Sequence, residues 1–374
     1  MAKKEHQVSA SDFNLQRLST RDLEQQVEAT IKMGGNIALF GRRGIGKTVI
    51  SKQKISDMKM KEVYLNLSVM ERVDIGGYPN IMNSDPKRKF VDFLLPEFYQ
   101  SLIEGSEPVV ALLDEVDKAD PSLFAPLLEF TQFRTINGKK LPNLAAIITT
   151  GNLLSEGGSR PSPPLLDRME KFLIEADLES WLNWAGKKGK IHSSITSYIS
   201  DNPNDLFGAV DPEDRYADPS PRGWARASEI LYKGEELGLS PDLLIKKVTG
   251  CVGKDAGIKY VNYFEHYQQL LPLVEQIFLG QDITDRYESL ERTKKLVATM
   301  IVCARLASIL DQGDKNKIAT SVKNVGRFLQ SAADEDFLVA VRSQIQLDRL
   351  VSHGIDEHPD WESKLSKIRA RING

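Results

Sequence analysis

The chain has few cysteines, almost no net charge and no very long apolar run. Cys251 and Cys303 are its two cysteines in 374 residues, which excludes a disulfide framework and suits a reducing compartment. Lysine and arginine total 49 against 52 acidic residues, so the formal charge is −3. A balanced charge does not require a nucleic acid or an anionic membrane as partner.

The longest apolar segment, residues 296–310, contains Thr299, Arg305 and Ser308. It falls short of the roughly 20 apolar residues that a membrane span needs, so we expect a buried helix there. The first residues, Met1 to His6, are polar and lead into no apolar stretch, so the sequence predicts no secretory signal. We therefore expect a cytoplasmic protein without a membrane span.

Short apolar segments alternate with helical periodicity in the first half of the chain. We expect strands at residues 36–40, 62–67, 109–113 and 144–149, a helix within 11–34 that stops at Gly34-Gly35, and a helix at 47–58. Continuous apolar strands that alternate with helices are typical of a parallel sheet covered on both faces. The sequence therefore predicts an α/β fold in this half.

Helical periodicity replaces the strand pattern after about residue 178. We expect helices within 178–186, 225–238, 241–251, 260–271, 290–310 and 318–350. A chain of this length favours two or three domains. We divide it into an α/β domain at 1–177, a helical domain at 178–288 and a C-terminal helical extension at 289–374, whose role stays open.

A glycine-rich motif lies between the first predicted strand and the helix that follows. It fits G-x-x-x-x-G-K-[ST] and comprises Gly41, Arg42, Arg43, Gly44, Ile45, Gly46, Lys47 and Thr48, with Val49 next. In such a loop, backbone N–H groups and the helix N-terminus bind phosphates, Lys47 contacts the β- and γ-phosphates, and Thr48 ligates Mg²⁺. A glycine-rich turn with a solvated lysine is the alternative. The placement between strand and helix favours an ATP site.

Two carboxylates, Asp114 and Glu115, follow the apolar strand at 109–113. Neighbouring parallel strands open onto one crevice at their carboxyl ends, so this pair should face the phosphates. Asp114 is then placed to hold Mg²⁺ through a water molecule, and Glu115 to orient and deprotonate the attacking water. An isolated Asp-Glu is usually a helix N-cap, but the phosphate-binding loop favours the functional interpretation.

Three further polar residues are candidates. If the strand at 144–149 lies between the other two, the amide of Asn152 can reach the γ-phosphate, although Asn after Gly is ordinarily turn chemistry. Arg168 and Arg222 carry guanidinium groups that suit charge on a transferring phosphoryl group. Spacing alone does not distinguish either arginine from a surface charge.

Taken in order, six blocks resemble the AAA+ superfamily, most closely its MoxR branch, over about residues 20–280. They are residues 112–121, 125–129, 149–152, 156–157, 166–168 and 220–222. The resemblance implies that Asn152 is sensor 1, Arg168 the arginine finger offered to a neighbouring subunit, and Arg222 sensor 2. It also implies a ring, usually a hexamer.

The same resemblance assigns two loops. Residues 74–77 are similar to the segment where this clade carries an insertion in helix 2, and 134–141 resemble its pre-sensor-1 hairpin; both are expected to face the pore of the ring. Independently, Asn137-Gly138 is a type I′ hairpin signal. The sequence departs from the family pattern at Arg42, Arg43 and Lys118. It also departs at residues 161–164, where a proline-rich run replaces part of the usual lead-in to the finger, so Arg160 is a rival finger.

Three classes of function fit these observations. The first is an ATP-driven ring that remodels or matures a protein client, as MoxR relatives do alongside von Willebrand factor A domain proteins. The second is a DNA- or RNA-dependent motor or loader, with which residues 87–89 and Lys139-Lys140 are compatible, although a solvated loop explains them equally. The third is a slow nucleotide-gated switch, against which Glu115 argues. The balanced charge favours the first.

Overall fold

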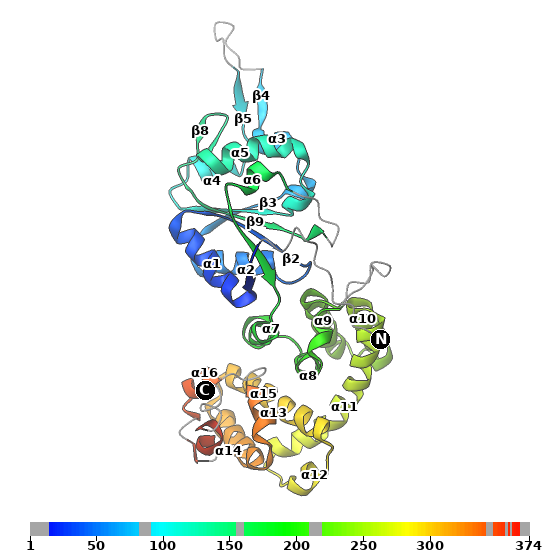
Figure 1. Cartoon of the computed structure of the whole chain (residues 1–374). Helices are drawn as coiled ribbons and strands as arrows, with labels where there is room; N and C mark the ends of the chain where they lie inside the picture. The colour runs from blue at the N-terminus through cyan, green and yellow to red at the C-terminus, as the bar shows by residue number, and fades with distance from the viewer. Residues whose placement is uncertain are drawn as a thin grey trace. The chain divides into compact units, whose positions relative to one another are not determined.

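The computed structural model describes residues 15–81, 91–154, 161–208, 219–341, 347–355, 358–359 and 361–366. The chain divides into two compact units, Met1–Asp177 and Leu178–Gly374, each with a hydrophobic core of its own (Figure 1). The further division of the second unit at residue 288 stays a prediction.

A parallel sheet forms the centre of the first unit. Its strands run in the order β1-β10-β2-β9-β6-β3, and every neighbouring pair is parallel. The bounds are β1 Gln16–Ser19, β2 Asn36–Gly41, β3 Lys61–Asn66, β6 Val109–Asp114, β9 Leu144–Gly151 and β10 Glu170–Glu175. The α/β prediction and the four expected strands are confirmed. β9 lies between β2 and β6, which is the condition that the interpretation of Asn152 required.

Two strands of this sheet were not predicted. The helix expected within 11–34 begins only at Thr20, because Ser19 caps it by accepting a hydrogen bond from the Asp22 N–H, and β1 precedes the cap. β10 follows the helix α6 and pairs with both β1 and β2. β1 has four residues and no buried one, so its own sequence carries no strand signal. Pairing with β10 makes it a strand.

Helices cover both faces of the sheet. Figure 1 shows α1 and α2 on one face and α3, α4 and α5 on the other. Their bounds are α1 Thr20–Met33, α2 Lys47–Asp57, α3 Arg72–Gly76, α4 Tyr99–Ile103, α5 Phe124–Phe133 and α6 Pro163–Leu166. α1 ends at Gly34 in the left-handed conformation, as the glycine pair predicted.

Two small antiparallel hairpins lie beside the sheet. The first joins β4 Tyr78–Asn80 to β5 Asp92–Leu94, and the second joins β7 Thr135–Ile136 to β8 Lys139–Lys140. Asn137 and Gly138 both have positive φ, 49° and 77°, which confirms the predicted type I′ turn. The Asn137 amide donates to the Gly76 carbonyl at 2.5 Å, and Lys139 pairs with Asp92 at 3.2 Å. The two hairpins therefore contact each other.

All the regular secondary structure described in the second unit is helical. Its helices are α7 Leu178–Trp184, α8 Ser193–Asp201, α9 Pro221–Glu236, α10 Pro241–Val252, α11 Lys254–Phe278, α12 Thr284–Glu288, α13 Arg292–Gln312, α14 Lys315–Ser331, α15 Asp334–Ala340 and α16 Leu347–Ser352. Its core includes tightly packed rings of Tyr198, Trp224 and Tyr260. The helix expected over 318–350 is interrupted after Ser331, a correction to that prediction.

The apolar segment at 296–310 lies within α13 and contributes to the core, as expected. No helix in the described part of the chain combines the length and the hydropathy that a bilayer crossing requires. Cys251 and Cys303 are both free thiols in helices.

Candidate nucleotide-binding site

The glycine-rich loop turns tightly between β2 and α2. Gly44 and Gly46 have φ of 77° and 101°, a region that side chains disfavour. A Cβ on Gly41 would lie 2.7 Å from the Ile174 carbonyl oxygen, so the close approach of β10 also requires glycine there. Ile45 is buried and anchors the loop. The sequence motif thus corresponds to a backbone that only these glycines permit.

The N-terminus of α2 opens onto this loop. Its N-cap is Gly46, which has no side chain to accept a hydrogen bond from the first turn. The N–H groups of that turn carry the positive end of the helix dipole, and phosphate oxygens are suitable acceptors for them. Arg43 and Val49 are exposed beside the loop and Arg42 is half-buried.

Lys47 is buried and holds the loop to the neighbouring strand. Its ammonium donates to the carbonyl oxygens of Gly41 at 2.8 Å and Arg42 at 2.9 Å, and to the Asn152 Oδ1 at 3.4 Å. A cation surrounded by oxygen atoms at the mouth of a glycine loop can equally contact phosphate oxygens. Lys47 therefore links the residues after β2 to the residue after β9.

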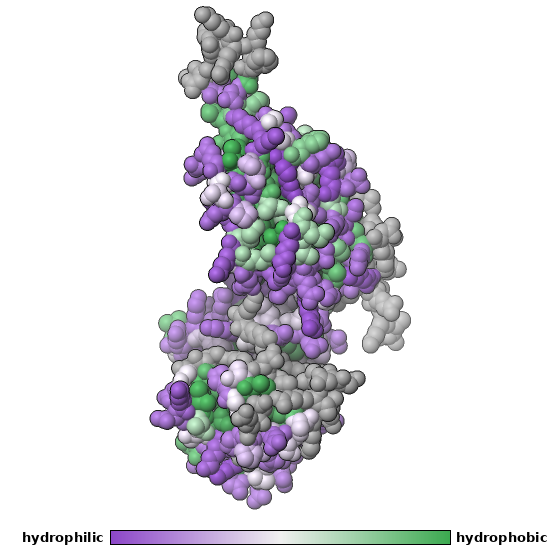
Figure 2. Space-filling view, turned by 90° about the vertical axis from the view of Figure 1, so that its left-hand side faces the viewer, coloured by the Kyte–Doolittle hydropathy of each residue, from purple (hydrophilic) through white to green (hydrophobic). Residues whose placement is uncertain are grey.

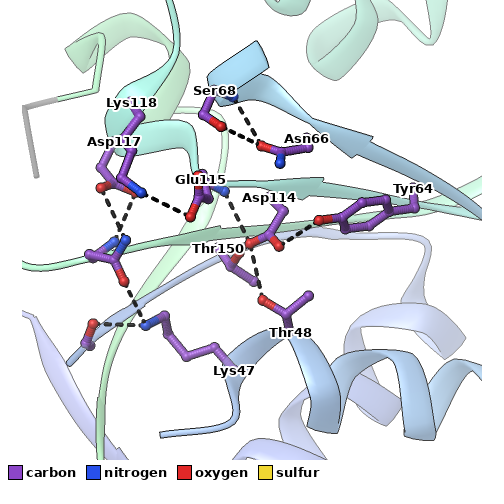
Figure 3. A network of polar contacts seen from close by, with 12 residues as sticks. Lys47, Thr48, Tyr64, Asn66, Ser68, Asp114, Glu115, Asp117, Lys118 and Thr150 are labelled. Carbon is purple, nitrogen blue, oxygen red and sulfur yellow. Dashed lines mark hydrogen bonds and ion pairs between the residues drawn. The ribbon is translucent and has the colours of Figure 1, made fainter. Parts of the chain in front are cut away.

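Asp114 lies at the centre of the polar network in Figure 3. One carboxylate oxygen accepts hydrogen bonds from the hydroxyl groups of Thr48, at 3.0 Å, and Thr150. The other oxygen accepts from the Tyr64 hydroxyl at 3.0 Å. The structure therefore brings the end of the glycine loop and the first acidic residue into direct contact, as the parallel-sheet argument predicted.

Glu115 adopts an unusual backbone conformation, with φ of 58° in the left-handed region. Its carboxylate pairs with the Lys118 ammonium at 2.9 Å. The hydrogen bond from Lys118 holds the pKa of Glu115 below its ordinary value, although partial burial acts in the opposite direction. The carboxylate is thus kept ionised, which a proton acceptor needs.

Asn152 is oriented by a buried acid, Asp117. The Asp117 carboxylate accepts from the Asn152 backbone N–H at 2.9 Å and from its Nδ2 at 3.3 Å. Because Asp117 only accepts hydrogen bonds, it sets the amide so that the Oδ1 of Asn152 faces Lys47.

The structure does not bring Arg168 into this cluster. Its carbonyl accepts from the Nδ2 of Asn36, the first residue of β2, whereas the glycine loop follows the last residue of that strand, about 17 Å further at about 3.3 Å per residue. The Arg168 guanidinium donates from Nε to Gln132 Oε1 at 2.8 Å and from Nη1 to the Pro164 carbonyl. Arg168 therefore lies at the end of the sheet where β2 begins, opposite to the end where the glycine loop lies.

Two other candidates lie outside this geometry. Arg222 is exposed in the first turn of α9, in the second unit, so the first unit by itself does not contain it. Arg160, the rival finger, lies outside the described residues, as do residues 87–89 and 156–157.

Sequence reasoning missed several residues of the network, namely Tyr64, Ser68, Asp117 and Thr150. The Ser68 hydroxyl donates to Asn66 Oδ1 at 2.8 Å, and Ser68 also acts with Lys118 to lower the pKa of Glu115. Two of them have a signal in the sequence: Asp117 and Thr150 lie within the blocks 112–121 and 149–152 that carry the family resemblance, each two residues from a predicted site residue. Tyr64 carries no such signal.

Comparison with known proteins agrees with this geometry. A family model described as an AAA domain of the dynein-related subfamily matches residues 36–169. This part of the chain is an AAA domain. The AAA domain spans the glycine loop, the acidic pair, Asn152 and Arg168, and the fold is that of an AAA+ P-loop protein. No curated protein matches the chain.

Solved structures that are similar to the chain include the RuvB Holliday junction branch migration motor of Thermotoga maritima. It is 12% identical, with a TM-score of 0.40 over 69% of this chain and 75% of that chain. A point variant of the same RuvB is 14% identical, with a TM-score of 0.39 over 69% of this chain and 74% of that one.

The residues of the AAA domain fit a magnesium nucleotide. Thr48 and Asp114 provide a hydroxyl and a carboxylate, the hard oxygen ligands that Mg²⁺ prefers. Among the described residues, no group of three or more His, Cys, Asp or Glu could hold a metal by itself. Mg²⁺ typically uses one or two protein ligands together with substrate phosphates, so this sparse donor set agrees with a metal that enters with its nucleotide.

Proposed function

We propose that this chain is a magnesium-dependent ATPase of the MoxR-like AAA+ branch. In this proposal it forms a ring of six subunits, the usual number in the family, and remodels or matures a protein client. The observation that carries the ATPase part is the convergence of three strand ends: Lys47 and Thr48 follow β2, Asp114 ends β6, and Asn152 follows β9. AAA+ proteins generally use ATP and Mg²⁺ and commonly form rings, which supports the same assignment.

Each residue of the cluster has a chemical role in this proposal. The loop from Gly41 to Val49 binds the phosphates, and Lys47 contacts the β- and γ-phosphates. Thr48 and Asp114 would hold Mg²⁺, which, when bound, neutralises the charge of the phosphate oxygens. Glu115 accepts a proton from the attacking water, and the Asn152 amide, held by Asp117, contacts the γ-phosphate and that water.

The position of Arg168 is the reason for proposing a ring. Arg168 lies at the edge of the sheet opposite to the glycine loop, so its guanidinium can serve as an arginine finger only for the nucleotide of a neighbouring subunit. Arg222, at the start of α9, is assigned to sensor 2. A guanidinium is suited to both tasks because it stabilises charge on the transferring phosphoryl group.

The surface of the first unit supports a protein client. The β4–β5 hairpin exposes four large apolar side chains with exposed fractions of 55–74%, Tyr78, Ile81, Val91 and Leu94. Figure 2 shows apolar surface at the upper end of the first unit, where this hairpin lies. Exposed apolar side chains gathered on one hairpin are typical of a protein interaction site. A von Willebrand factor A domain protein is the partner that the MoxR resemblance suggests.

A DNA- or RNA-dependent motor is the alternative function. Of the two lysines on β8, Lys139 gives it little support, because it pairs with Asp92 and donates to the Phe93 carbonyl at 3.2 Å. A lysine engaged in this way contributes less to phosphate binding than a solvated one.

Steady-state ATPase assays separate the two functions. We expect Mg²⁺-dependent phosphate release that an unfolded model protein stimulates and that duplex or single-stranded DNA leaves unchanged. Stimulation by DNA alone would favour the motor. For the ring, we expect Glu115→Gln with Mg-ATP to elute as a closed oligomer in size-exclusion chromatography with light scattering. A monomer at micromolar concentration would contradict that part of the proposal.

A further inference from the structure

Tyr64 contacts the proposed magnesium ligand from outside the sequence motifs. It lies on β3, the edge strand next to β6, and its hydroxyl donates to the Asp114 Oδ2 at 3.0 Å (Figure 3). The other carboxylate oxygen accepts from Thr48 and Thr150 and from the Glu115 N–H at 3.1 Å. Both oxygens of the carboxylate are therefore fixed, and Tyr64 provides the contact to the second one.

The Tyr64 ring is itself held in place. The Lys52 ammonium lies 3.7 Å from the ring centroid, and the same ammonium pairs with Glu62 at 3.1 Å. A cation over the face of a tyrosine is attracted by the ring quadrupole. Lys52 is on α2, one turn after Thr48. The helix that carries Thr48 therefore also orients Tyr64, which in turn contacts Asp114.

The hydroxyl of Tyr64 contributes little to folding by this geometry. The side chain is 41% exposed, and water can replace a hydrogen bond at such a position at small cost in stability. A phenol hydroxyl carries its proton at neutral pH, so Tyr64 is the donor in its hydrogen bond to Asp114. A role in orienting Asp114 therefore explains the contact better than a role in stability.

We propose that Tyr64 is a positioning residue that orients the Asp114 carboxylate for magnesium and thereby sets the metal requirement of nucleotide binding. The inference rests on the proposed ATPase function. Mg²⁺ demands nearly ideal octahedral geometry, so an Asp114 carboxylate that has lost the donor to Oδ2 and is held through Oδ1 alone binds it less well. Groups that hydrogen-bond to metal ligands typically change metal affinity by about 10- to 100-fold.

The test is the Mg²⁺ dependence of binding of a fluorescent, non-hydrolysable ATP analogue. We expect Tyr64→Phe, which removes only the hydroxyl, to raise the Mg²⁺ concentration at half-saturation by roughly tenfold. Its affinity for the analogue in EDTA should equal that of the wild type. Lys52→Met should shift the same curve in the same direction by a smaller factor, because it loosens the ring without removing the hydroxyl.

Tyr99→Phe is the matched control. Tyr99 is buried in the same unit and donates to the Ile75 carbonyl at 2.8 Å, away from Asp114. This variant should lower the melting temperature and leave the Mg²⁺ curve unchanged. Tyr64→Phe should instead shift the Mg²⁺ curve and leave the melting temperature nearly unchanged.

A Mg²⁺ curve for Tyr64→Phe within twofold of the wild type would overturn the inference, and so would a curve shifted to lower Mg²⁺, which would mean that the hydroxyl competes with the metal. If Tyr64→Phe does not fold, Lys52→Met carries the same test. A wild-type protein that shows no Mg²⁺-dependent nucleotide binding would instead refute the proposed function, so the two failures are distinguishable.

Discussion

Replacing Asp117 by Asn tests whether the buried acid orients the Asn152 amide. The change keeps the size of the side chain but turns one acceptor into a donor. The new amide cannot accept from the Nδ2 of Asn152, so the Asn152 amide should rotate and turn its own N–H groups toward Lys47. The contact of Asn152 with Lys47, and with the γ-phosphate in the proposed mechanism, is then lost.

The size of the effect follows from the type of bond that is lost. A hydrogen bond with a charged partner contributes about 2 kcal/mol. If it is made in the transition state, its loss lowers kcat by about thirtyfold. The assay is steady-state phosphate release at saturating ATP, combined with equilibrium nucleotide binding, which we expect to change far less than kcat.

Two comparisons make this prediction specific. Asp120→Asn is the matched control, because Asp120 is exposed in the same loop and caps the Ser122 N–H at 2.8 Å; its kcat should equal that of the wild type. In a double-mutant cycle, Asp117→Asn should have little further effect in an Asn152→Ala background. Wild-type turnover in Asp117→Asn, or additive losses in the cycle, would refute the reasoning.

Three other predictions concern the loop, the finger and the second unit. Lys47→Ala should weaken ATP binding by roughly a hundredfold, since charge-assisted contacts to phosphate are lost, whereas Lys54→Ala on the same helix should not; isothermal titration measures both. Arg168→Ala should lower turnover on the order of a thousandfold and spare ATP binding, and if Arg160→Ala does so instead, the finger lies upstream. Burial raises the pKa of Asp336, so the folded state favours its protonated form and stability should rise as pH falls toward the unfolded pKa. Asp336→Asn should therefore melt higher than the wild type at pH 8 and converge with it near pH 4.

Much of the sheet and of the site could be predicted because their signals are local. The run from Asn36 to Thr48 contains a buried strand, positive-φ glycines and a helix start in unbroken order, and each feature has its own residue type. The parallel arrangement then brings Asp114 to Thr48, since parallel strands share one carboxyl edge. No knowledge of the loops between the strands was needed for that step.

The missed parts depend on tertiary structure. β1 is a strand because β10 pairs with it, and no residue of β1 is buried. Tyr64 reaches Asp114 because β3 pairs with β6 in a register that places Asn66 opposite Asp114, which no local pattern specifies. Asp117 reads from sequence as an ordinary loop acid, and only the fold places it under the Asn152 backbone.

The most direct test of the ATPase assignment is phosphate release by the purified chain and by its Glu115→Gln variant, each with Mg²⁺ and with EDTA. The wild type should release phosphate only with Mg²⁺, and Glu115→Gln should bind ATP with comparable affinity while releasing phosphate at least about a hundredfold more slowly. Equal turnover by the two proteins, or failure of both to bind ATP, would contradict the account.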